Sequence, residues 1–163
     1  MSFVDRIHFL LITSCGLGLA PVASGTVGTL GGVILAVLLQ ATIRDHAVLA
    51  WWIAAVVLFV YGCSTSAYVA RVWPNKDPGQ FVLDEVVGYL VTVAVYAMLA
   101  GKLPDAWGHA AAFFAFRAFD VLKIQPARWL EGLPGALGIM ADDQMAGVYA
   151  GVSTWLLLSW MGW

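Results

Sequence analysis

Charged residues are scarce in this chain of 163 residues. Asp, Glu, Lys and Arg together make up 11% of it, hydrophobic residues make up 61%, and the mean hydropathy is +0.85. Soluble domains average about 25% charged residues, so the composition excludes an ordinary domain that faces water on all sides. The net charge of -2 and the isoelectric point of 5.8 provide no basic face, which excludes nucleic acid as a partner.

Cysteine and histidine are also rare. Cys15 and Cys63 lie in apolar surroundings without C-x-x-C spacing, and His8, His46 and His109 are far apart in the sequence. This pattern excludes a disulfide framework and a zinc site built from thiolates and imidazoles. We interpret both cysteines as small buried thiols and the histidines as structural or interfacial residues.

The few charges are segregated from long apolar runs. Five apolar segments stand out, at residues 27–43, 47–70, 86–101, 106–119 and 144–163. A helix needs about 20 residues to cross a bilayer, and tryptophans gather near the segment ends, as in the aromatic belt of membrane proteins. The sequence therefore predicts a single domain, residues 1–163, that folds as an all-α polytopic membrane helical bundle.

We expect about four to five membrane-embedded helices, because segments 86–101 and 106–119 are short for a full span. A very apolar soluble helical bundle is the alternative. The N-terminal stretch FLLITSCGLGLAPVAS has some features of a secretory signal, but Asp5 offsets Arg6 and the apolar core is short. We interpret this stretch as a loop that leads into the first helix.

Basic residues predict the orientation. If all five segments cross, one side receives the N-terminal stretch and the loops 71–85 and 120–143, and the other receives 44–46, 102–105 and the C-terminus. Two basic residues fall on the second side, Arg44 and Lys102. Six fall on the first side: Arg6, Arg71, Lys76, Arg117, Lys123 and Arg128. The excess of positive charge predicts that the first side is cytoplasmic.

A glycine-rich stretch, SCGLGLAPVASGTVGTLGG, occupies residues 14–32. Its glycines allow backbone N–H groups to approach a ligand, and Ser24, Thr26 and Thr29 add hydroxyl groups before the first predicted helix. Such a loop can bind phosphate. Membrane helices also use glycine for close packing, and no G-K-[S/T] ending of a Walker loop follows, so both interpretations stay open.

Acidic pairs stand beside two of the apolar segments. Asp84 and Glu85 open a segment whose next sixteen residues carry no charge, and Asp142 and Asp143 immediately precede the last segment. Acids at helix N-termini can serve the helix dipole or cap the helix. Adjacent acids that enter a membrane segment indicate instead a cation or proton site.

A third polar cluster, FRAFDVLKIQPARWL, occupies residues 116–130. Arg117, Asp120 and Lys123 recur at intervals of three and share one broad stripe of a helix, which is also the pattern of a structural ion-pair ladder. Arg128 follows on the same predicted side of the membrane. Small residues after the last acidic pair allow close helix packing that would bring the acids together: Ala146, Gly147, Ala150 and Gly151.

Together these clusters predict one site of five carboxylates and three cations. Carboxylate oxygens without clustered His or Cys suit Mg²⁺ or Mn²⁺, and neighbouring cations suit a phosphate group. The residues themselves therefore predict a metal-dependent enzyme that acts on a phosphorylated substrate at the cytoplasmic membrane surface. The members are Asp84, Glu85, Asp120, Asp142, Asp143, Arg117, Lys123 and Arg128.

Four motifs, in order along nearly the whole chain, resemble the phosphatidylglycerophosphatase A family of bacterial membrane enzymes. They read GLGLAPVASGTVGTLGG, VLDEVVGY, FRAFDVLKIQPARWLE and GALGIMADDQMAGVYAG. The resemblance implies Mg²⁺-dependent removal of the terminal phosphate from phosphatidylglycerophosphate, giving phosphatidylglycerol in phospholipid biosynthesis at the bacterial inner membrane. The matching site positions are Asp84, Glu85, Asp120, Lys123, Arg128, Gly138, Asp142 and Asp143.

Two positions depart from the family pattern. The family usually has K-P-W-P where this chain has Lys123-Ile124-Gln125-Pro126, and a second glycine is common where Ala136 stands. Neither departure removes a charged residue, so the implied reaction class stands. The first departure bears on the shape of a loop near the head group and hence on substrate preference.

The chemistry of the site residues, together with the family resemblance, predicts a role for each of them. Asp84, Glu85, Asp142 and Asp143 would hold Mg²⁺ (or Mn²⁺ in its place). Substrate phosphate would be bound by five side chains, those of Arg117, Lys123, Arg128, Thr26 and Thr29. Water would attack with Asp120 or another acid as base. Direct attack by an aspartate stays open, and we count the six charged residues Asp84, Glu85, Asp120, Lys123, Asp142 and Asp143 as catalytic.

Two other classes of protein compete with the enzyme. A small cation transporter would use similar acids, but it would place them mid-membrane with a path from both sides. A non-catalytic membrane scaffold would have no use for acids and cations gathered on one face.

Overall fold

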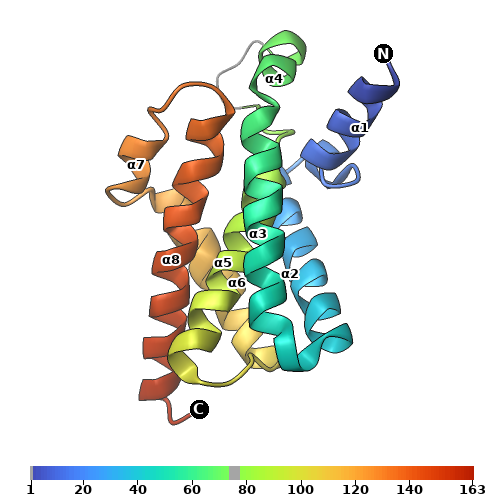
Figure 1. Ribbon diagram of the computed structural model, residues 1–163. Helices are drawn as coiled ribbons and strands as arrows, with labels where there is room; N and C mark the ends of the chain where they lie inside the picture. The colour runs from blue at the N-terminus through green and yellow to red at the C-terminus, as the bar shows by residue number, and fades with distance from the viewer. Residues whose placement is uncertain (1, 74–77) are drawn as a thin grey trace.

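The computed structural model describes residues 2–73 and 78–163, and within those residues the chain is all helical with no strand (Figure 1). This confirms the predicted all-α bundle. In chain order the elements are α1 Phe3–Ile12, η1 Leu17–Leu19, α2 Ser24–Thr42, η2 Arg44–His46, α3 Ala47–Ser64, α4 Ser66–Val72, α5 Leu83–Ala100, α6 Ala106–Leu122, α7 Ala127–Leu130 and α8 Ala136–Trp160, where η marks a 3-10 helix.

Three helical stretches are long and apolar enough to cross a membrane: Ser24–Thr42, Arg44–Ser64 and Leu83–Ala100. Helix α6 has 17 residues, and α8 has 25 but contains the acidic pair. The loops sort to two ends of the bundle as the alternation of segments predicts. The N-terminus, α4 and α7 lie at one end, and the C-terminus lies at the other with the α2–α3 and α5–α6 turns (Figure 1). Lys76, one of the six basic residues counted above, is outside the described residues.

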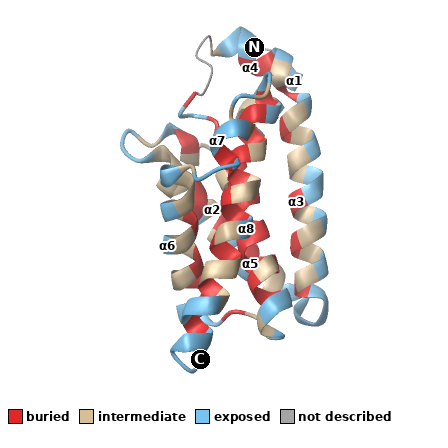
Figure 2. Ribbon diagram, turned by 90° about the vertical axis from the view of Figure 1, so that its left-hand side faces the viewer, coloured by how far each residue is buried: buried red, intermediate tan, exposed pale blue. Residues whose placement is uncertain are grey.

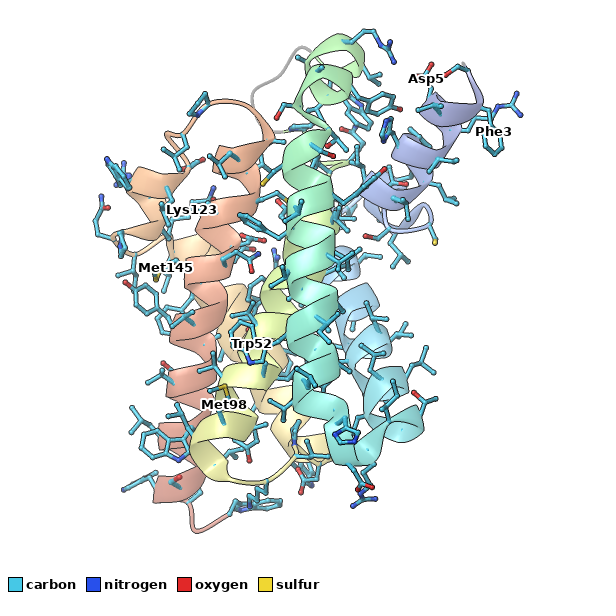
Figure 3. All side chains as sticks on the ribbon, viewed as in Figure 1. Phe3, Asp5, Trp52, Met98, Lys123 and Met145 are labelled. Carbon is cyan, nitrogen blue, oxygen red and sulfur yellow. The ribbon has the colours of Figure 1, made fainter. Side chains whose placement is uncertain are left out.

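Helix α5 forms the centre of the bundle. Of the apolar stretch of α5, 72% is buried inside the bundle, whereas only 22% is buried in Ser24–Thr42 and in Arg44–Ser64. The buried residues follow α5 and the face of α8 that meets it (Figure 2). Helix α3 covers α5 in part through a contact of Trp52 Nε1 with Met98 Sδ at 3.3 Å (Figure 3). This contact ties α3 to the C-terminal end of α5.

Glycines let α5 and α8 approach backbone to backbone. A Cβ atom added to Gly147 would lie 2.5 Å from the carbonyl oxygen of Gly88, and one added to Gly151 would lie 2.7 Å from that of Thr92. On the other side, a Cβ atom on Gly88 would lie 2.9 Å from the carbonyl oxygen of Asp143. The small-residue stripe predicted from the sequence therefore does pack closely, and its partner is α5.

Three of the predicted boundaries are wrong. Segment 47–70 is not one helix, because α3 ends at Ser64 and α4 begins at Ser66. The hydroxyl groups of Ser64, Thr65 and Ser66 each donate to the carbonyl oxygen three residues back, at 2.6, 2.7 and 3.0 Å. Such bonds compete with helix continuation.

The other two errors concern helix starts. Helix α2 begins at Ser24, so the expected loop 14–32 is helical in its second half, including Thr26 and Thr29. Helix α8 begins at Ala136 after Gly135, whose φ is 63°, so Asp142 and Asp143 lie in its second turn. The acidic pair therefore does not cap this helix.

Isolated polar side chains serve packing. His109 contacts Tyr89 Oη at 2.9 Å through Nδ1 and Gln40 Oε1 at 3.2 Å through Nε2, which ties α6 to α5 and α2. His8 Nδ1 lies 2.7 Å from Tyr61 Oη and joins α1 to α3. Cys63 is half-buried, but Cys15 is exposed in the turn after α1, so the prediction of a buried thiol is wrong for Cys15.

The close approach of α5 and α8 generates the first prediction. Gly147→Ala should destabilise the protein by about 1–3 kcal/mol, because the added methyl group has no space beside the Gly88 carbonyl. A thermal melt in detergent measures the effect. Val148→Ala, at a partly exposed position of the same helix, is the control and should melt close to the wild type. Equal melting of Gly147→Ala and wild type would contradict the packing.

Candidate active site

A polar pocket of about 280 Å³ opens at the end of the bundle that carries α7. The first turn of α5, the start of α2, the end of α6 and the second turn of α8 all contribute to it. It is lined by Ser24, Gly79, Phe81, Asp84, Glu85, Arg117, Asp120, Val121, Lys123, Glu131, Gly135, Ile139, Asp142 and Asp143. Six of these are acidic and two are basic, so the pocket has a strong excess of negative charge.

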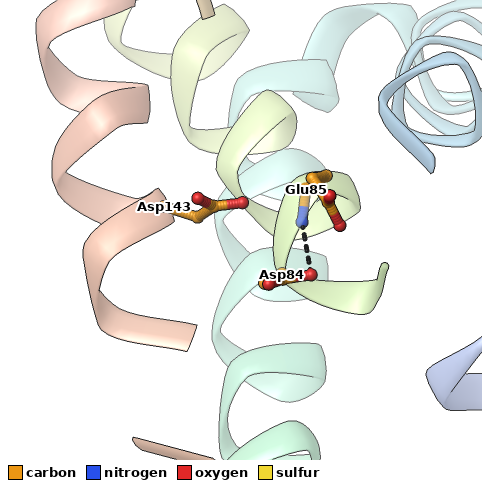
Figure 4. A group of neighbouring side chains, drawn as sticks. All are labelled: Asp84, Glu85 and Asp143. Carbon is orange, nitrogen blue, oxygen red and sulfur yellow. Dashed lines mark hydrogen bonds between the residues drawn. The ribbon is translucent and has the colours of Figure 1, made fainter. Parts of the chain in front are cut away.

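Three carboxylates converge across the α5–α8 contact. Asp84 and Glu85 come from the first turn of α5, and Asp143 faces them from α8 (Figure 4). One oxygen from each of the three lies within 4.8 Å of the others. The side chain of Asp84 also accepts a hydrogen bond from the backbone N–H of Glu85 at 3.0 Å, which fixes its orientation. Three oxygens at this spacing are close enough to ligate one small cation.

The burial of these groups fits a cation-binding role. Asp84 is 7% exposed and Asp143 is 3% exposed. Glu85 Oε2 and Asp143 Oδ2 are buried and have no hydrogen-bond partner among the described residues. Buried carboxylate oxygens without partners are costly. A divalent cation that prefers oxygen ligands would satisfy them, so the donor set fits Mg²⁺ or Mn²⁺.

Arg117 stands at the α2 side of this carboxylate group. Its Nη1 lies 2.5 Å from Asp120 Oδ2, 4.0 Å from Glu85 Oε1 and 3.4 Å from Thr29 Oγ1. The guanidinium needs a glycine nearby, because a Cβ atom on Gly25 would lie 2.4 Å from Glu85 Oε1 and 3.1 Å from both Arg117 Nη atoms. The glycine-rich stretch thus makes room for the charged side chains of α5 and α6.

Lys123 is held at the opposite side of the pocket. It ends α6 with a φ of 45°, and its Nζ lies 2.9 Å from Glu131 Oε1 and 3.0 Å from Asp142 Oδ2. Burial disfavours the charged form, but the hydrogen bonds and the charges of Glu131 and Asp142 outweigh it and raise the pKa of Lys123. Lys123 is therefore a fixed positive charge at neutral pH.

Comparison with known proteins decides the family. A profile of the family described as "Phosphatidylglycerophosphatase A" matches residues 10–158. A Haemophilus influenzae protein named phosphatidylglycerophosphatase A is 35% identical over 162 residues, which cover 99% of this chain and 94% of that protein. The Escherichia coli protein of the same name is 32% identical over 146 residues, covering 85% and 76% respectively.

This chain belongs to the phosphatidylglycerophosphatase A family. It is therefore a phosphatase of the phosphoric monoester class, as the motifs of the sequence predict. A Bacteroides thetaiotaomicron protein named "Putative phosphatidylinositol-3-phosphatase" is also 33% identical over 156 residues, covering 91% of this chain and 94% of that one. No solved structure matches the chain.

The pocket brings together most of the site residues expected for the family. Asp84, Glu85 and Asp143 form the carboxylate group, and Arg117, Asp120 and Lys123 flank it. Asp142, the fourth expected metal ligand, instead accepts a hydrogen bond from Lys123, and its Oδ1 accepts one from the Asp143 backbone N–H at 3.0 Å. Lys123 follows the last residue of α6, so the predicted stripe of three helical positions ends at Asp120.

Other expected site residues lie apart from the pocket lining. Arg128 is on α7 and exposed. Thr29 donates to the Gly25 carbonyl oxygen at 2.8 Å and contacts Arg117, so it supports a pocket residue, and Thr26 lies in the first turn of α2. Two further residues line the pocket. The sequence predicts no site role for Glu131, and for Ser24 it predicts only a hydroxyl group in the glycine-rich stretch. Glu131 lies eight residues after Lys123, but α6 ends at Leu122 and α7 spans Ala127–Leu130, so no continuous helix relates the two residues.

The setting of Arg117 generates the second prediction. Arg117→Met should destabilise the metal-free protein by about 3–5 kcal/mol, because it leaves buried acids without their cation. Asp120→Asn combined with Arg117→Met should recover part of that loss, since the two residues form one ion pair. Thermal melts of the two single variants and the double variant in chelator measure this. Strict additivity of the two single changes would show that the pair does not interact.

Proposed function

We propose that this chain hydrolyses the terminal phosphate of phosphatidylglycerophosphate, that Mg²⁺ assists, and that the pocket faces the cytoplasm at a bacterial inner membrane. The proposal rests on a pocket at one end of the helical bundle that is lined by three clustered carboxylates and two cationic side chains. A lipid with its acyl chains in the bilayer would present its head group at that level.

Charge balance supports the metal. A phosphate monoester is an anion, and a pocket with six acidic and two basic side chains would repel it. We assign Asp84, Glu85 and Asp143 as the metal ligands. When bound, Mg²⁺ would neutralise this charge, polarise the phosphate and lower the pKa of a water molecule. Asp142 is not among these ligands, and its carboxylate orients Lys123 through their ion pair.

The cationic side chains would bind the phosphate. Arg117 is oriented by Asp120 and Thr29, and Lys123 is oriented by Glu131 and Asp142, from opposite sides of the carboxylate group. Charge that develops on the phosphoryl oxygens in the transition state is stabilised by such fixed donors. The short ion pair of Asp120 with Arg117 favours an orienting role for Asp120 over that of the base.

Hydrolysis then needs water to attack phosphorus while the bond to the lipid oxygen breaks. A carboxylate of the pocket would accept the proton of the water, and the leaving alcohol would regain a proton from the pocket or from solvent. The alternative classes, transporter and scaffold, are disfavoured by membership of a phosphatase family. The one-ended pocket also lacks the midplane position that a transporter site favours.

Phosphate release by the purified protein tests the proposal. We expect release from phosphatidylglycerophosphate in mixed micelles, with a lower kcat/KM for phosphatidylinositol 3-phosphate, the other lipid class suggested by a relative's name. Arg117→Met, in the pocket, serves as the inactive control. Preference for the inositol lipid would overturn the substrate proposal, and release from neither lipid would overturn the function.

Metal dependence gives a sharper prediction for the two adjacent aspartates. Asp143→Asn should lower kcat/KM at least roughly 100-fold and raise the Mg²⁺ concentration needed for half-maximal activity, because a ligand is lost. Asp142→Asn should lower kcat/KM by roughly 10-fold through Lys123 without changing the Mg²⁺ requirement.

Mg²⁺ titrations of both variants measure this difference. Chelator should abolish wild-type activity, and Mg²⁺ or Mn²⁺ should restore it. An unchanged Mg²⁺ requirement in Asp143→Asn, or a raised one confined to Asp142→Asn, would reverse our assignment of the ligands.

Orientation is tested by cysteine labelling in intact cells. The background has Cys15 and Cys63 replaced by serine. Gln80→Cys adjoins Gly79 of the pocket lining, and Asp45→Cys lies in η2 between α2 and α3; both positions are exposed. We expect an impermeant maleimide to label Asp45→Cys and to spare Gln80→Cys until the cells are lysed. The opposite pattern would place the pocket outside the cytoplasm.

A further inference from the structure

A second cavity of about 320 Å³ lies between α1, α2, α3 and α5. Its walls are almost wholly apolar, and they include Leu10 from α1, Ile34 and Leu38 from α2, and Leu58 from α3. Ligand pockets have volumes of about 300–1,000 Å³, so the cavity is large enough to hold part of a small molecule. Its lining includes Leu17, Gly31, Leu83 and Val86 from two family motifs, but the proposed reaction gives these residues no role.

The second cavity is separate from the acidic pocket. Between the two, α2 packs directly on α5 and the segment before it. A Cβ atom on Gly28 would lie 2.6 Å from Val82 Cβ, and one on Gly32 would lie 2.9 Å from Tyr89 Cβ and 3.2 Å from Val86 Cα. No side chain fits in this contact, so a molecule bound in the second cavity does not reach the carboxylates through it.

One polar group in the cavity wall lacks a partner. Ser14 lines the cavity, and its Oγ is buried without a hydrogen-bond partner in the described part of the chain. Ser14 and Cys15 both have left-handed backbone angles, with φ of 47° and 59°. Because this oxygen has almost no exposed surface, rotation about χ1 of Ser14 would be needed before its hydroxyl could donate to an acceptor that enters the cavity.

We propose that this cavity binds an acyl chain of a bilayer glycerophospholipid that is not the substrate, and that Ser14 donates a hydrogen bond to its ester carbonyl oxygen. Helices α2 and α3 are candidate membrane spans, so acyl chains are the molecules that surround this wall. Gly31 to Leu38 extends the apolar wall over about 10 Å of α2. A hydroxyl donor at the α1 end and hydrocarbon below it match the order of ester and chain in a lipid.

The position of the cavity connects it with the catalytic helix. Leu83 and Val86 line the second cavity, while Asp84 and Glu85 line the acidic pocket from the same turn of α5. An acyl chain would therefore pack against the back of the turn that presents two of the three carboxylates. The bound lipid would support that turn without contacting the substrate.

Native mass spectrometry with dioleoylphosphatidylcholine tests the proposal. This lipid is a phosphodiester, so it is not a substrate for a phosphomonoesterase, and its binding is measured independently of activity. We expect the wild type to retain one molecule of it and to melt at a higher temperature in its presence, since a ligand of the folded state stabilises it. Ile34→Trp should lower the bound fraction about tenfold by filling the cavity.

Val37→Trp is the matched control. Val37 and Ile34 are both exposed apolar residues of α2, at 43% and 58%, but only Ile34 lines the cavity. Val37→Trp should therefore bind as the wild type does. Leu38→Trp, at another exposed lining position, provides a second filling variant if Ile34→Trp does not fold. Equal binding by the filling variant and the control would overturn the site, as would a protein dimer in place of the lipid adduct.

The ester contact has its own test. The wild type should bind the ester lipid severalfold more than its diether analogue, which lacks the carbonyl oxygens, and Ser14→Ala should bind both lipids equally. Equal binding of both lipids by the wild type would overturn the role of Ser14.

Discussion

The close approach of α5 and α8 is the constraint on which the site depends. Gly88 and Gly147 bring the two backbones together, and this contact places Asp143 against Asp84 and Glu85 (Figure 4). Lipid hydrocarbon supplies no hydrophobic drive for helices to associate, so packing of small residues has to provide the contact energy. The same contact must also withstand the repulsion of three clustered carboxylates, which a bound cation would offset.

The two cations of the pocket are fixed in different ways. Arg117 projects from within α6 and is braced by Asp120 and by Thr29 of α2. Lys123 follows the helix end, where a left-handed backbone angle turns it toward Glu131 and Asp142. Each cation therefore has its own acidic partners, and Arg117 also approaches Glu85 at 4.0 Å. If Asp84, Glu85 and Asp143 hold the metal, as proposed, this arrangement would separate phosphate binding from metal binding within one small pocket.

The sequence predicts the helical class, the two-ended sorting of the loops and the gathering of most of the acids, because hydropathy and small-residue spacing report directly on membrane packing. It does not predict which acid pairs with which cation. Asp142 and Asp143 are neighbours in sequence, yet they point to different partners, since successive helical residues are about 100° apart. The hydropathy pattern does not predict their place inside α8, because the charged pair interrupts the apolar run, whereas the helix begins at Ala136. Glu131 was missed because its contact with Lys123 depends on the path of the α6–α8 connection.

The position of the pocket at one end of the bundle restricts which lipids it can serve. The hydrocarbon core of a bilayer is about 30 Å thick, so a head group in the opposite leaflet is separated from the carboxylates by nearly the length of α5. Dephosphorylation would thus be confined to a single leaflet, and the product would accumulate there first. The product would reach the other leaflet only by crossing the bilayer. By then the lipid would have lost a phosphate with two negative charges, and moving charge through hydrocarbon is costly.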